Sequence, residues 1–127
     1  MTAYAGACHC GGVRFRIEAE IRELTVCDCS LCTRRNAVMA AVPLAALEVT
    51  RGEDLLQLYE WNTHQAKHRF CRRCGIYVFH RKRSEPDHYG VNVFCLEGFD
   101  PAGVPVRRFQ GSQMSAVDPG DDAGAEA

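Results

Sequence analysis

Several features of other protein classes are missing from this sequence of 127 residues. It has no long apolar run, so nothing in it predicts a helix that spans a membrane. Its first residues, MTAYAGACHC, lack the basic start and the apolar centre of a signal peptide, so we expect a cytoplasmic protein. The formal net charge is only −1, which argues against a strong electrostatic field for nucleic acid or membrane binding.

Helical periodicity is also missing, because no window of about 11 residues shows an apolar stripe at helical spacing. Strand-like alternation is present instead: in GVRFRIEAE, the residues Val13, Phe15 and Ile17 alternate with charged side chains. Other candidate strands are ELTV, AVMAAV before Pro43, the two halves of LEVTRGEDLLQLYEW around a turn at Arg51–Gly52, IYVFHR, YGVNVFC and VPVRRF. PLAALEV could form one helical turn. Many short strands at close spacing predict an all-β domain.

The chain is long enough for one domain and too short for two. We expect a single folded domain over residues 1–114. The remaining residues, 115–127, are small and acidic and have no apolar spacing, so they predict a weakly ordered tail.

Cysteine is abundant, with eight residues in the chain. In a protein without an export signal, clustered cysteines indicate metal ligands or catalytic thiols, and an extracellular disulfide framework is the alternative. Seven of them fall into three short motifs, and Cys95 stands alone. The motifs are CHC (Cys8, Cys10), CDCSLC (Cys27, Cys29, Cys32) and CRRC followed by Gly75 (Cys71, Cys74).

The two motifs with two cysteines each add up to one closed tetrahedral site. Cys8, Cys10, Cys71 and Cys74 therefore predict a structural zinc site. The triplet Cys27, Cys29 and Cys32 offers three ligands and leaves a fourth position open, as catalytic zinc sites do. We expect a second zinc there, which could be labile because three thiolates bind it less tightly than four.

Other residues have both a functional and an ordinary interpretation. Cys95 could complete the second site, although apolar neighbours favour a buried packing role. His68 could handle protons, and His9, which lies between two ligands, should point to the opposite face; both could simply be surface or packing residues. Arg34 and Arg35 follow the triplet and could bind substrate carboxylates, or could belong to a solvated turn.

The segments GACHCGGVRF, CDCSLC, GEDLLQLYEWNT, AKHRFCRRCGIYVFHRKR and YGVNVFCLEG resemble, in this order, the glutathione-dependent formaldehyde-activating enzyme and centromere protein V family. The resemblance covers roughly residues 5–110. It implies several coiled antiparallel β-sheets, similar to those of the zinc-binding methionine-R-sulfoxide reductases. It also implies that Cys8, Cys10, Cys71 and Cys74 are structural ligands and that Cys27, Cys29 and Cys32 are catalytic.

The activity that this resemblance implies is the joining of glutathione to formaldehyde, a carbon–sulfur lyase reaction in reverse. A thiol bound to zinc is deprotonated at neutral pH, so such a site could add a small thiol to a small aldehyde. We expect these two small molecules as partners, and neither a membrane nor a nucleic acid. The alternative function is a non-catalytic zinc scaffold that binds a macromolecular partner.

Overall fold

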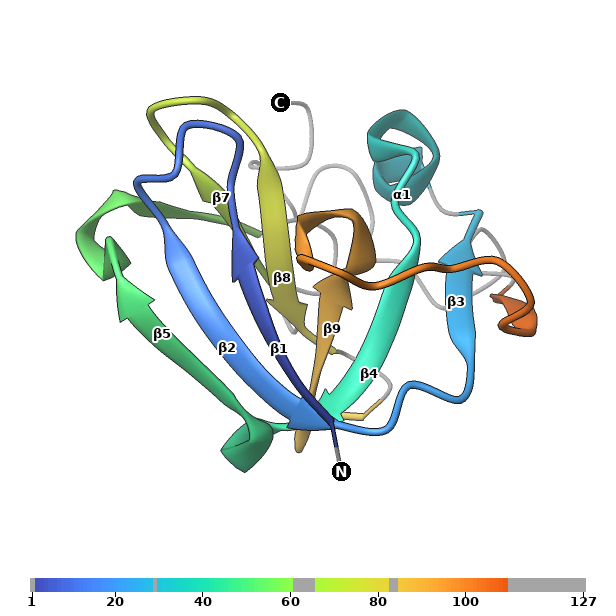
Figure 1. Cartoon of the computed structure of the whole chain (residues 1–127). Helices are drawn as coiled ribbons and strands as arrows, with labels where there is room; N and C mark the ends of the chain where they lie inside the picture. The colour runs from blue at the N-terminus through green and yellow to red at the C-terminus, as the bar shows by residue number, and fades with distance from the viewer. Residues whose placement is uncertain (1, 29, 61–65, 83–84, 110–127) are drawn as a thin grey trace.

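The computed structural model describes residues 2–28, 30–60, 66–82 and 85–109. Within this part of the chain, two β-sheets and one short helix form the fold (Figure 1). The elements are β1 (Thr2–Ala7), β2 (Arg14–Ala19), β3 (Leu24–Cys27), α1 (Ser30–Arg35), β4 (Met39–Pro43), β5 (Leu47–Arg51), β6 (Leu56–Tyr59), β7 (Lys67–Cys71), β8 (Tyr77–Arg81), β9 (His88–Asn92) and β10 (Val106–Phe109), with 3-10 turns at Leu44–Ala46, Glu53–Leu55 and Val93–Cys95. The expected all-β class is confirmed.

The smaller sheet has three antiparallel strands in the order β1-β2-β5. β2 alternates along its whole length, with Phe15, Ile17 and Ala19 buried and Arg14, Arg16 and Glu18 exposed. The strand predicted from GVRFRIEAE is thus present, and its apolar face covers the second sheet.

The larger sheet has seven strands in the order β10-β3-β4-β9-β8-β7-β6. Its neighbours pair antiparallel, as expected, except that β10 runs parallel to β3 with Val106 opposite Leu24. A parallel pair needs a long crossover connection, which the whole stretch of chain from β4 to β9 supplies here.

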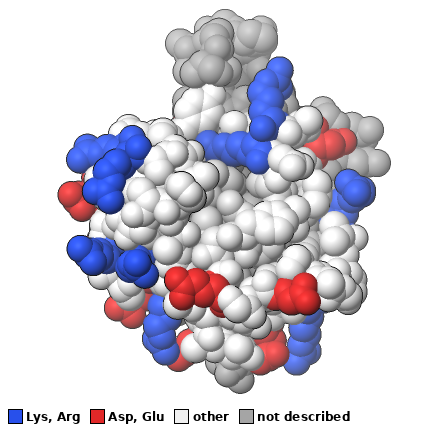
Figure 2. Space-filling model, turned by 45° about the horizontal axis from the view of Figure 1, so that its top comes forward, with Lys and Arg blue, Asp and Glu red and all other residues white. Residues whose placement is uncertain are grey.

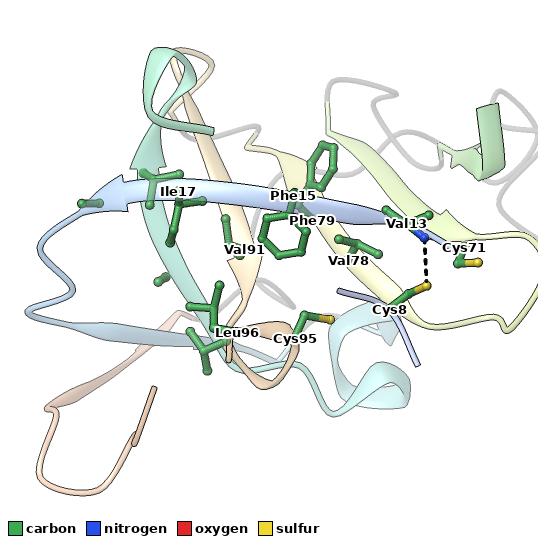
Figure 3. Close-up of a cluster of buried hydrophobic side chains, with 14 of the residues drawn as sticks. Cys8, Val13, Phe15, Ile17, Cys71, Val78, Phe79, Val91, Cys95 and Leu96 are labelled. Atoms are coloured by element: carbon green, nitrogen blue, oxygen red, sulfur yellow. Dashed lines mark hydrogen bonds between the residues drawn. The ribbon is translucent and has the colours of Figure 1, made fainter. Parts of the chain in front are cut away.

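The core lies between the two sheets (Figure 3). Phe15 and Ile17 come from the small sheet, and Val78 and Val91 come from the large one; all four side chains are at most 2% exposed. Leu96 joins them because a single bridge pairs it with Gly6. The sheet face that carries Val78 and Val91 therefore packs in the core. A functional site on the large sheet is expected on its opposite face.

Two predicted segments differ from the structure in informative ways. The strands β5 and β6 lie on either side of the predicted turn at Gly52, but they belong to different sheets, so the turn carries the chain from one sheet to the other. The strand predicted for YGVNVFC ends at Asn92, because the Asn92 side chain accepts a hydrogen bond from the Phe94 backbone and starts a 3-10 turn. PLAALEV contains the expected helical turn at Leu44–Ala46.

The sequence did not indicate β1, β7 or α1. The predicted boundary between residues 1–114 and 115–127 lies outside the described residues. Among the described helices, none is long and apolar enough to cross a membrane.

Candidate metal centre and a neighbouring polar cluster

The four cysteines of the two paired motifs come together in space. Cys8 follows β1 and Cys71 ends β7, and the turns after these strands bring Cys10 and Cys74 alongside. All four Sγ atoms lie within 4.8 Å of one another, and the Cys8–Cys10 and Cys10–Cys71 separations are 3.5 and 3.7 Å. A tetrahedral zinc site with bonds of about 2.3 Å has sulfur atoms about 3.8 Å apart. The donor set and its spacing therefore fit a metal ion and are consistent with zinc.

Tight turns hold these sulfurs in place. The Cys8 N–H donates to the Val13 carbonyl at 3.1 Å, and the Val13 N–H donates to Cys8 Sγ at 3.3 Å (Figure 3). On the other side, the Gly75 N–H donates to the Cys71 carbonyl at 2.7 Å. Gly75 has φ = 80°, a left-handed conformation that costs a residue without Cβ little. The glycine after CRRC thus closes the second turn.

The surroundings of the four sulfurs differ, and those of Cys10 favour the thiolate form. A hydrogen bond from the Gly12 backbone and the Arg73 guanidinium lower the pKa of Cys10 to about 6. At Cys74, burial acts to raise the pKa, but backbone hydrogen bonds from Cys10 and Ile76 contribute to a net lowering. Burial raises the pKa of Cys71, whose side chain is 0% exposed. A buried thiol of this kind ionises readily only with a cation beside it.

The triplet is only partly described. Cys27 is the last residue of β3, and Cys32 lies in α1. Both side chains are half-buried. Cys29 lies outside the described residues, so the convergence of the three sulfurs stays a prediction.

A group of three polar rings lies on the face of the large sheet that points away from the core. The Tyr77 hydroxyl hydrogen-bonds to His80 Nδ1 and lies 3.5 Å from His68 Nδ1. The imidazole rings of His68 and His80 stack with centroids 5.0 Å apart. His68 is 4% exposed, so this histidine, weighed above for proton handling, lies at the bottom of the group. We call Tyr77, His68 and His80 the ring cluster.

A β-bulge brings the ring cluster together. Arg69 pairs with Phe79, but the next residue, Phe70, pairs with Tyr77, so β8 has one extra residue at this point. Simple alternation would place Tyr77 and His80 on opposite faces, and the extra residue puts them on the same one. No local feature of IYVFHR indicates a bulge, which is why the sequence did not point to Tyr77.

Gly90 on β9 makes room for the ring cluster. A Cβ atom at this position would lie 2.5 Å from His80 Cε1. Gly90 also pairs directly with His80 across the two strands. The imidazole therefore occupies the space that a side chain at residue 90 would fill.

Arg35 connects α1 to this cluster. Its guanidinium carbon lies 4.0 Å from the centroid of the Tyr77 ring and 6.0 Å from that of Tyr59. Arg34, the other arginine singled out in the sequence, is exposed, as is His9. Of the two arginines, the structure therefore directs Arg35 toward the ring cluster.

Cys95 is a core residue. Its side chain is 8% exposed, and its Sγ donates to the Tyr77 carbonyl at 3.7 Å. It takes no part in the group of four sulfurs. The packing interpretation of this cysteine agrees with its position.

Figure 2 shows the molecule with the top of Figure 1 turned toward the viewer. Uncharged residues fill the centre of this face, and side chains of both signs lie around its margin. The charge on this face is thus distributed between acidic and basic groups.

Comparison with known proteins identifies the family of this chain. The sequence profile of the glutathione-dependent formaldehyde-activating enzyme family matches residues 3–111. A protein from Aspergillus terreus named "Putative glutathione-dependent formaldehyde-activating enzyme" is 26% identical over 114 residues, which are 87% of this chain and 59% of the relative. This chain thus spans about three fifths of the length of that relative.

A solved structure shows the same fold. It is a crystal structure of a Rhodobacter sphaeroides protein from a structural genomics programme, with a TM-score of 0.73 and 46% sequence identity. The alignment covers 81% of this chain and 99% of the other. The profile match spans nearly all of the described residues, and it includes the four clustered cysteines and the ring cluster. This chain belongs to the glutathione-dependent formaldehyde-activating enzyme family.

Proposed function

We propose that this protein is a zinc-dependent enzyme of the carbon–sulfur lyase type, which forms or cleaves an adduct between a thiol such as glutathione and a small aldehyde such as formaldehyde. The observation that carries the proposal is the position of Cys27 and Cys32. Both side chains are half-buried, and α1, which bears Cys32, also bears Arg35, whose guanidinium contacts the ring cluster. Membership of the family supports the choice of thiol and aldehyde.

The two groups of cysteines have different roles in this proposal. Cys8, Cys10, Cys71 and Cys74 bind a structural zinc, because all four ligand positions are filled by the chain. Cys27, Cys29 and Cys32 would hold a second zinc. Such an ion would lower the pKa of a thiol substrate, so that the thiolate forms at neutral pH.

The chain's own residues handle the proton. The thiol S–H bond breaks, a carbon–sulfur bond forms at the aldehyde carbon, and the proton ends on the former aldehyde oxygen. The Tyr77 hydroxyl can donate to that oxygen, because His80 and His68 lie beside it and can exchange the proton. In the cleavage direction the same hydroxyl receives the proton.

Zinc analysis combined with calorimetric titration of glutathione tests the proposal. We expect two zinc ions per chain in zinc-replete protein, and glutathione binding that disappears in Cys32→Ser. Cys95→Ala is the matched control, since it removes a cysteine from the core and should leave glutathione binding unchanged. The absence of binding by glutathione or any small thiol would reject the lyase function and favour the non-catalytic scaffold.

A further inference from the structure

The guanidinium of Arg35 has a donor without an acceptor. Its Nη1 atom is shielded from water and has no hydrogen-bond partner. Among the residues that the structure describes, it is the single buried side-chain nitrogen or oxygen without a hydrogen-bond partner. A buried charged donor without an acceptor is costly, and proteins rarely keep one without a functional reason.

The rest of the Arg35 side chain is fixed in place. The Tyr77 ring lies under the guanidinium at 4.0 Å, a distance at which cation and aromatic face attract. Tyr77 is itself buried and hydrogen-bonded to His80. The donor fork is therefore oriented before any ligand arrives, which reduces the entropy lost on binding.

The charges around Arg35 favour an anion. Among the described residues no carboxylate pairs with it, and the side chains that its guanidinium faces are the uncharged rings of Tyr77 and Tyr59. Glu60, which follows Tyr59, is instead paired with Lys67 at 2.8 Å. A planar guanidinium with free donors matches a carboxylate, which it can bind with two parallel hydrogen bonds.

The position of Arg35 in α1 indicates which molecule supplies the carboxylate. Arg35 lies three residues after Cys32 in α1, so the two side chains are neighbours on one helix face, with Cβ atoms about 5–6 Å apart. A ligand bound by Arg35 is therefore also close to Cys32.

We propose that Arg35 is the carboxylate-binding residue of this site and that it selects thiols carrying a carboxylate over neutral or cationic thiols. The inference rests on the proposed function, because it assumes that the triplet receives the sulfur. It adds the substrate class: the sulfur goes to the triplet, and a carboxylate of the same molecule goes to the Arg35 fork.

Paired ligands test this selectivity directly. Glutathione and its diethyl ester have the same thiol, but the ester has no free carboxylate. In cobalt-substituted protein, thiolate binding is followed by the sulfur-to-cobalt absorption band. We expect glutathione to bind about tenfold to a hundredfold more tightly than the ester. In Arg35→Gln the ratio should fall to about one, and Arg35→Lys, which keeps the charge and loses the fork, should lie between.

Arg22→Gln is the control for charge. Arg22 is exposed and precedes β3, at the end of that strand opposite Cys27, so this variant should keep the native ratio. A ratio near one in the native protein, or a native ratio in Arg35→Gln, would overturn the inference. Thermal melts of each variant identify any that fail to fold.

A ligand without a free thiol separates this inference from the proposed function. S-methylglutathione keeps both carboxylates and cannot supply a thiolate. In nitrogen-15 NMR spectra of the native protein, we expect it to shift the Arg35 Nε–H resonance, and the diester of the same compound to leave that resonance in place. A shift of the Arg35 resonance supports the carboxylate site even if no thiol binds the metal. An unchanged resonance overturns the carboxylate site, whatever the result of the thiol titrations.

Discussion

At the scale of single residues, the surroundings of each sulfur decide its chemistry. Cys10 is exposed and has its pKa lowered to about 6 by the Gly12 backbone and Arg73, whereas burial raises the pKa of Cys95 to about 11. The sequence could predict which four cysteines gather, because counting ligands in the motifs was enough. It could not predict these pKa differences, since Arg73 and the core are brought to the sulfurs only by the fold.

Cys95 should be unreactive in the native protein. Its raised pKa keeps the thiol protonated at neutral pH, and thiolate is the reactive form. The pKa of Cys95 is higher in the folded state than its ordinary value of 9.0, which we take for the unfolded state. The protonated thiol therefore stabilises the fold below pH 9.0, and this stabilisation is lost as the pH rises toward about 11. We expect mass spectrometry to show no alkylation of Cys95 by iodoacetamide at pH 7.5, and rapid alkylation in urea. Labelling at equal rates in both conditions would contradict its burial.

At the scale of elements, strands with clear alternation could be predicted and irregular ones could not. β2 follows its pattern residue by residue, whereas the bulge in β8 depends on pairing with Arg69 and Phe70 of another strand. β7 itself was missed because its residues, KHRFC, are mostly polar or half-buried. The four-cysteine site needed only the motifs, but the ring cluster needed the register of β7, β8 and β9.

Gly90→Ala tests that register. The new methyl group would lie 2.5 Å from His80 Cε1, so the imidazole must move or the strands must separate. We expect a loss of about 1–3 kcal/mol in the free energy of unfolding, measured by urea denaturation. The double variant Gly90→Ala/His80→Ala removes the clash and should recover part of this loss. No loss in the single variant, or no recovery in the double one, would show that His80 does not occupy this space.

At the scale of the whole molecule, the four cysteines tie together distant parts of the chain. Cys10 and Cys71 are 61 residues apart and their sulfurs are 3.7 Å apart. Cys8 belongs to the connection after the first strand of the small sheet, and Cys71 to the large sheet, so one metal ion would join both sheets. Metal binding at such a site contributes directly to folding.

Removing that metal should therefore unfold the protein. Structural zinc sites contribute about 10 kcal/mol or more, which is comparable to the whole stability of a small domain. We expect Cys71→Ser to lose soluble folded protein, and a strong chelator to abolish the cooperative thermal transition seen by circular dichroism. Cys32→Ser should keep its melting temperature, because the other site is intact. A normal melting temperature in Cys71→Ser would count against the structural role.

The acidic segment 115–127 should have no part in the fold. Its composition offers no apolar surface to bury, so we propose that the folded domain ends near residue 114. Deleting residues 115–127 should leave the melting temperature unchanged within error. A clear decrease would mean that the segment packs against the domain.

The parallel pairing of β10 with β3 has a practical consequence. Phe109 lies opposite Cys27, so β10 ends at the same end of the sheet as Cys27. The N-terminus lies at the other end of the molecule (Figure 1). A polyhistidine tag fused behind residue 127 would thus be tethered to a strand end beside Cys27 and could supply the proposed zinc with an imidazole. Affinity tags for metal and thiol measurements on this protein belong at the N-terminus.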